Sequence, residues 1–86
     1  MDSKIKIHLQ LYSILREKLP PEAKGQAVLH LNNGSSLQDL LDELEITRKV
    51  VISVNDDHES ELSRRLQDGD QVKIFSSISG GEYILP

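Results

Sequence analysis

The residues best suited to chemistry are two consecutive glycines near the end of the chain, Gly80 and Gly81. They follow a stretch in which Val72 and Ile74 recur with a period of two, which is typical of a β-strand. Because glycine has no Cβ, its backbone fits a narrow channel and lets reacting groups approach closely. A strand that runs into a di-glycine segment predicts a domain that holds out a slim tail.

The same two glycines also suit a turn, since Gly-Gly is a good turn dipeptide. In that alternative the apolar segment Tyr83–Leu85 folds back as an edge strand, and the tail is a permanent part of the structure. The residues alone leave both interpretations open.

The other reactive residue types form no catalytic or metal-binding set. The chain has no cysteine, which excludes disulfides, thiolate catalysis and cysteine-ligated metal. We expect His8 and His30 on one face of a sheet, but the pattern offers no further ligands, so we predict two surface histidines and no metal site. The segment 56–59 lacks the spacing of a calcium loop and predicts a polar turn. The segment 68–70, Asp-Gly-Asp, predicts a tight turn without chemistry.

Size and charge limit the classes of function. A chain of 86 residues predicts one domain with a modest core and little room for a deep enzyme pocket. The net charge of −4 argues against nucleic acid as a partner, because phosphate binding needs a basic stripe. The acidic residues between positions 39 and 61 suit either a solvated face or a basic partner surface. We expect a cytoplasmic protein with no membrane partner, since no apolar run approaches the length of a membrane span.

Hydrophobic periodicity predicts the elements that must position the tail. Alternating apolar residues predict strands over 5–11, 27–31, 50–54 and from Gln71, with one very short strand between 58 and 66. A short helical segment over 13–19 should end at the two prolines that follow it. The main helix begins after Ser35 or Ser36, and it buries one stripe of leucines: Leu37, Leu40, Leu41 and Leu44.

These elements predict an α+β fold: a mixed sheet of four to five strands with one main helix packed on one face. Leu62 and Leu66 are expected to reach the core from the polar segment before the last strand. Phe75 shares its strand face with Lys73 and should lie on the uncovered side of the sheet. An exposed aromatic residue needs no function, but beside a functional tail Phe75 becomes a candidate docking anchor.

The sequence resembles the MoaD/ThiS family of small sulfur-carrier proteins. The resemblance is spread over about 70 residues, and the order and spacing of its short segments carry it. The matching segments are Tyr12-Ser13-Ile14-Leu15-Arg16-Glu17, Leu29-x-Leu31, Gly34-Ser35-Ser36-Leu37, Asp39-Leu40-Leu41, Val54-Asn55, Leu66-x-Asp68-Gly69-Asp70-x-Val72, Phe75 and Ser79-Gly80-Gly81.

The resemblance implies a ubiquitin-like β-grasp domain over residues 1–79 and a tail over 80–86. It also implies a carrier that is not itself an enzyme. An ATP-dependent, ubiquitin-activating-like partner would adenylate the carboxylate of Gly81, and conversion to a thiocarboxylate would let it donate sulfur to an accepting synthase. Mg-ATP would belong to the partner, and the carrier would bind no cofactor. Gly80, Ile78 and Ser79 would shape the tail, and Phe75 would help to dock it.

Two departures from the family pattern matter. Residues 82–86 follow Gly81, so a zinc metalloprotease would have to remove them before Gly81 has a free carboxylate. Ser76-Ser77 stands where the family often has two prolines, which would stiffen the tail. Two alternatives stay open: a ubiquitin-like modifier that joins Gly81 to lysines, and an interaction module that keeps its extension. The sulfur acceptor is open among a molybdopterin precursor, thiazole, cysteine or another metabolite, and tRNA.

Overall fold

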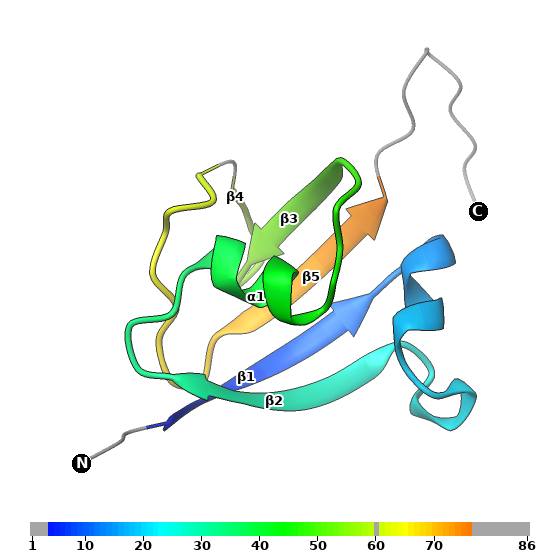
Figure 1. The fold of residues 1–86 in the computed structure, drawn as a ribbon, viewed down its shortest axis with the longest axis horizontal. Helices are drawn as coiled ribbons and strands as arrows, with labels where there is room; N and C mark the ends of the chain where they lie inside the picture. The colour runs from blue at the N-terminus through cyan, green and yellow to red at the C-terminus, as the bar shows by residue number, and fades with distance from the viewer. Residues whose placement is uncertain (1–3, 60, 77–86) are drawn as a thin grey trace.

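Five strands form one mixed sheet in the order β2-β1-β5-β3-β4 (Figure 1). The structure, a computed structural model, describes residues 4–59 and 61–76. The strands are β1 (Lys4–Leu11), β2 (Gln26–Asn32), β3 (Val50–Val54), β4 (Asp57–Glu59) and β5 (Gln71–Ser76). Only β1 and β5 are parallel among these neighbours, and the other three pairs are antiparallel. The predicted α+β class with a mixed sheet is confirmed.

Strict alternation of apolar and polar residues places one face of the sheet in the core. In β1, Ile5, Ile7, Leu9 and Leu11 are all buried, whereas Lys4, Lys6 and His8 between them are exposed. In β5, Val72 and Ile74 are fully buried and point to the same face. Successive side chains of a strand point to opposite faces, so the polar residues line an open face.

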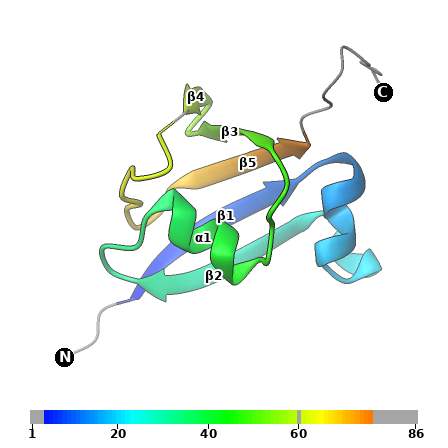
Figure 2. The same ribbon diagram turned by 45° about the horizontal axis from the view of Figure 1, so that its top comes forward.

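One α-helix, α1 (Leu37–Glu43), lies across the buried face of the sheet, as Figure 2 shows. Ser36 is its N-cap: its hydroxyl oxygen accepts a hydrogen bond from the Asp39 backbone N–H, and the Asp39 carboxylate accepts one from the Ser36 N–H. This reciprocal pair selects Ser36 over Ser35 as the start of the helix. Leu37, Leu40 and Leu41 are buried, so the predicted leucine stripe meets the sheet.

The predicted short helix over 13–19 forms as a 3₁₀ helix, η1 (Ser13–Lys18), followed by a second one, η2 (Pro21–Ala23). Leu15 is the buried residue of η1. Among the helices of the described residues, none is long and apolar enough to cross a membrane.

Two expectations about the segment after β3 are wrong. Residues 57–59 form strand β4 rather than part of a polar turn, because Asn55 and Asp56 make a two-residue hairpin turn before them. Both turn residues have positive φ, 53° and 72°, the backbone shape of the tight hairpin turns that suit twisted strands. Leu62 is not a core residue: 37% of its surface is exposed, whereas Leu66 is buried as predicted.

Candidate functional site

The last described strand, β5, ends at Ser76, and residues 77–79 separate it from the predicted tail over 80–86. β5 lies between β1 and β3, so it is an inner strand with neighbours on both sides. Ile78, Ser79, Gly80 and Gly81 lie outside the described residues, as does the extension that follows them. Their roles therefore stay predictions, whereas β5, the strand that leads to them, lies within the described residues.

A network of hydrogen bonds fixes the start of β5 to the β3–β4 turn. The backbone N–H of Asn55 donates to the Gln71 carbonyl oxygen at 2.8 Å, and the Gln71 N–H donates to Asn55 Oδ1 at 2.9 Å. Asn55 Nδ2 donates to Asp70 Oδ1 at 3.0 Å, and the Gln67 N–H donates to Asp70 Oδ2 at 2.8 Å. Asp70 is only 7% exposed, so its charge is held by these donors rather than by open water.

The turn over residues 68–70, which precedes β5, is also hydrogen-bonded to β1. The Lys6 N–H donates to Asp68 Oδ1 at 2.7 Å, and the Gly69 N–H donates to the Lys6 carbonyl oxygen at 2.7 Å. The His8 N–H donates to the Asp70 carbonyl oxygen at 2.9 Å. The turn over 68–70 was predicted, but its role in joining three strands was not. A signal existed, since Val54-Asn55 and Asp68-Gly69-Asp70 both belong to the family pattern.

The open face carries an apolar cluster beside the end of β5. The rings of Tyr12 and Phe75 stack with centroids 4.3 Å apart and an interplanar angle of 13°. Val51 lies directly opposite Phe75 on the neighbouring strand. Phe75 is 37% exposed and Val51 is 42% exposed. We call Tyr12, Val51 and Phe75 the aromatic patch. The predicted exposure of Phe75 on the uncovered face is confirmed, and its docking role stays a prediction.

A charged pair borders the aromatic patch. Lys73 lies one pleat before Phe75 on the same face, and its Nζ donates to Asp56 Oδ1 at 3.1 Å. The Asp56 carboxylate raises the pKa of Lys73, first through this hydrogen bond and then through its charge, so Lys73 stays cationic at neutral pH. Both side chains are open to water, and such pairs add little to stability. The pair therefore places two exposed charged groups at the rim of the patch.

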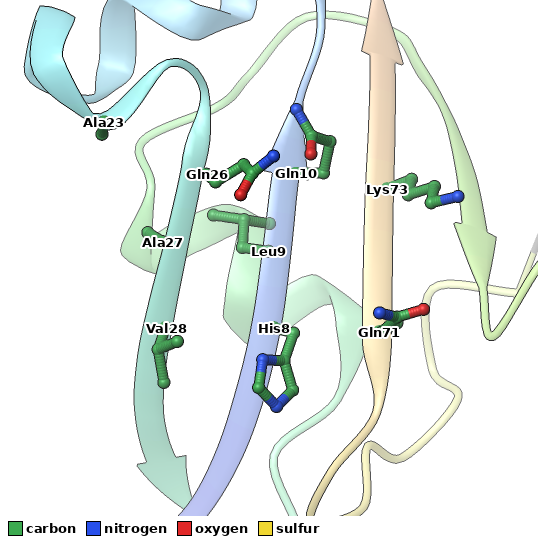
Figure 3. A pocket seen from close by; sticks show the side chains of 9 residues that line it. All are labelled: His8, Leu9, Gln10, Ala23, Gln26, Ala27, Val28, Gln71 and Lys73. Atoms are coloured by element: carbon green, nitrogen blue, oxygen red, sulfur yellow. The ribbon is translucent and has the colours of Figure 1, made fainter.

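A shallow depression of about 470 Å³ lies on the open face across β2, β1 and β5 (Figure 3). Polar and apolar groups line it in about equal measure, and its polar side chains come from three strands: His8, Gln10, Gln26, Gln71 and Lys73. These side chains can exchange hydrogen bonds with a protein surface. They supply no nucleophile paired with a base.

The two histidines lie on neighbouring strands, as expected. His8 is opposite Val28, and His30 is opposite Lys6 in the β1–β2 register. Over residues 4–59 and 61–76, no group of three or more His, Cys, Asp or Glu residues could hold a metal ion.

A known protein family matches most of this sequence. The ThiS family model matches residues 9–81, which is most of the chain. A sequence search of curated proteins gives no match.

Solved structures share the fold at low sequence identity. A putative molybdopterin converting factor subunit 1 from Pyrococcus furiosus matches with a TM-score of 0.69 at 20% identity, covering 86% of this chain and 99% of that one. Small archaeal modifier protein 1 from H. volcanii matches with a TM-score of 0.68 at 13% identity, covering 86% and 99%. A chain from the complex between subunits 1 and 2 of the molybdopterin-converting factor from Helicobacter pylori matches with a TM-score of 0.60 at 17% identity. The match covers 90% of this chain and 100% of that one. The expected ubiquitin-like β-grasp fold is confirmed.

Proposed function

This chain belongs to the ThiS family, and we propose that it is a sulfur carrier whose reactive group is the carboxylate of Gly81. Removal of residues 82–86 creates that carboxylate. An ATP-dependent enzyme adenylates it, a sulfur nucleophile converts it to a thiocarboxylate, and the thiocarboxylate donates sulfur in the synthesis of a cofactor or metabolite. The chain is the protein substrate of these steps and not their catalyst.

The observation that carries this proposal is where the family match stops. The match ends at Gly81 and leaves the five residues from Glu82 to Pro86 outside it. The end of the match at the second glycine of the pair supports Gly81 as the last residue of the proposed carrier form. This supports the view that the extension belongs to a precursor.

The chemistry needs little from the carrier beyond a reachable carboxylate. Adenylation joins the Gly81 carboxylate to the α-phosphate of ATP and releases pyrophosphate. AMP is then a good leaving group, so a sulfur nucleophile can attack the carbonyl carbon. Glycine at both tail positions keeps the reacting carbonyl uncrowded. Mg-ATP and the catalytic groups reside on the activating enzyme.

The aromatic patch supplies the docking surface for that enzyme in this proposal. Large aromatic side chains dominate binding energy at protein interfaces, and Phe75 sits one residue before the end of β5. Docking there places the root of the tail at a fixed point, because hydrogen bonds at Asn55 and Asp70 hold the start of the same strand. Ser76 and Ser77 stand where the family often has two prolines, so the fixed φ that proline would supply is missing at these positions.

Two further partners follow from the proposal. A metalloprotease cleaves the Gly81–Glu82 peptide bond, and a synthase accepts the sulfur. The structure from H. pylori contains subunits 1 and 2 of a molybdopterin-converting factor together, and it supports a second protein as the receiver. The sulfur acceptor stays open among a molybdopterin precursor, thiazole, cysteine or another metabolite, and tRNA.

A second candidate function is protein modification. The structural likeness to small archaeal modifier protein 1 favours it, because the same activated glycine can react with a lysine instead of with sulfur. Finding Gly81 in isopeptide linkage to lysines of other proteins would support this alternative.

Pyrophosphate exchange with the adenylating enzyme of the same organism tests the proposal. The chain ending at Gly81 should support ATP–pyrophosphate exchange, whereas the full chain and a matched chain ending at Gly80 should support little. Equal exchange with the full chain would contradict the need for trimming. No exchange with any form would overturn the carrier proposal.

A further inference from the structure

Strand β2 is the longer of the two outer strands of the sheet that residues 4–59 and 61–76 form (Figure 1). Outer strands present unpaired backbone groups, and proteins usually shield them with charged side chains, with proline or by keeping the strand short. The other outer strand, β4, has only three residues, and its first and last residues are acidic. β2 has seven residues, Gln-Ala-Val-Leu-His-Leu-Asn, with no proline and no Asp, Glu, Lys or Arg. β2 is therefore an unshielded edge.

The β1–β2 ladder determines which backbone groups of β2 point outward. The Leu11 N–H donates to the Gly25 carbonyl oxygen at 2.7 Å, which makes Leu11 and Gly25 a hydrogen-bonded pair. In an antiparallel ladder such pairs recur at every second residue, and the residues between them turn their N–H and C=O groups to the opposite side. The N–H and C=O groups of Gln26, Val28 and His30 therefore point away from β1, toward the outer edge of the sheet.

Apolar side chains flank these outward groups on both faces of β2. Val28 is 49% exposed on the open face. On the other face, Leu29 is only partly buried against the core, and Ala27 is also partly exposed. A strand added alongside β2 would cover all three side chains, so this edge favours an apolar strand as its partner.

A second copy of β2 fits this edge, because antiparallel pairing about Val28 matches each outward group with another. Val28 lies opposite Val28 of the second copy, and Gln26 lies opposite His30 of the second copy. On the other face, Leu29 meets Ala27 of the second copy. Both strands use the same surface, so the contact is self-complementary and closes as a dimer.

The charges beyond the two ends of β2 favour the antiparallel arrangement. The segment before β2 has a net positive charge, from Arg16, Glu17, Lys18, Glu22 and Lys24. At the other end of β2, a depression of about 640 Å³ has a net negative lining, from Lys4, Asp39, Asp42 and Glu43. Antiparallel pairing sets the positive end of each copy beside the negative end of the other, whereas parallel pairing would set like charges together.

We propose that β2 is a dimerisation edge, at which two copies of this chain pair antiparallel about Val28 and join their sheets into one. β1 lies between β2 and β5, so this pairing leaves the aromatic patch of each copy uncovered. The dimer therefore does not depend on the proposed function. Because one pair of strands forms a small interface, the dimer is weak and reversible.

Sedimentation equilibrium of the full chain, up to about 1 mM protein, tests the pairing. We expect a monomer–dimer equilibrium that Val28→Lys weakens at least about tenfold, because two lysines then lie directly opposite each other. Val51→Lys is the matched control: Val51 is 42% exposed on the open face of β3, away from β2, and its replacement should leave the dimer intact. A chain that is monomeric at every concentration would overturn the proposal. So would a dimer that Val28→Lys leaves intact or that both variants weaken equally.

Amide hydrogen exchange identifies the edge without any substitution. The N–H groups of Val28 and His30 point outward, so their exchange should slow as the concentration of the chain rises. The N–H groups of Ala27 and Leu29 point to β1, and their exchange should not depend on concentration. Exchange that is independent of concentration at all four residues, or that slows only at Ala27 and Leu29, would contradict pairing through this edge.

Discussion

Replacing Asp70 by alanine should destabilise the domain far more than replacing an exposed aspartate. Asp70 accepts hydrogen bonds from Asn55 Nδ2 and from the Gln67 N–H, at 3.0 and 2.8 Å, and it is 7% exposed. A hydrogen bond to a charged group contributes about 1.5–3 kcal/mol. Because water can partly replace the lost acceptor, the lower value applies, and two bonds give about 3 kcal/mol. For a domain of this size, that corresponds to a fall in Tm of about 12–24 °C.

Urea unfolding followed by far-UV circular dichroism measures this change, since the chain has no tryptophan. The slope of the transition should stay constant while its midpoint falls, as expected for a pure loss of stability. Asp57→Ala is the matched control: Asp57 is exposed on β4, and its replacement should change the free energy of unfolding by less than about 0.5 kcal/mol. A loss below about 1 kcal/mol for Asp70→Ala, or equal losses for both variants, would refute the assigned role of the network.

Three further changes test the packing and the docking surface. Leu40→Ala removes a fully buried helix side chain and should lower the free energy of unfolding by about 2–5 kcal/mol in urea titration. Gly25→Ala should lower the free energy of unfolding by more than about 1 kcal/mol, measured by urea titration. The reason is that Gly25 has a φ of 79° and a Cβ there would lie 2.6 Å from the Leu11 carbonyl oxygen. Phe75→Ala should weaken binding of the trimmed chain to the activating enzyme at least about tenfold by calorimetry, whereas Val28→Ala should not. Equal affinities of those two variants would contradict docking at the aromatic patch.

Local patterns were enough to predict the elements that bury a regular face. The period of two in β1 and the leucine stripe of α1 each record which side of the element meets the core. The capping pair between Ser36 and Asp39 is equally local, since its two residues are three apart. Such features depend on neighbours in the chain, so a single sequence shows them.

Local patterns failed where a partner distant in the chain decides the outcome. One very short strand was expected between 58 and 66, but its place at 57–59 was not, because the turn at Asn55 and Asp56 is what returns the chain alongside β3. Leu62 has an apolar side chain but lies on a loop that does not direct it into the core. Apolar character alone does not bury a residue outside a regular element.

The candidate site shows the same division. Exposure of Phe75 followed from its parity with Lys73, but its stacking on Tyr12 joins residues far apart in the chain. The role of Asp70 also required the fold, because one of its donors, Asn55, lies on the β3–β4 turn, distant from Asp70 in the chain. The residues of the tail itself, from Ile78 to Gly81, lie outside the described residues and stay predictions.

The intact mass of this protein, recovered from its own cells, tests the central claim most directly. The carrier account predicts a species that ends at Gly81, with a fraction in which one oxygen is replaced by sulfur. A chain that always ends at Pro86, under every growth condition, would contradict the account and favour an interaction module that keeps its extension.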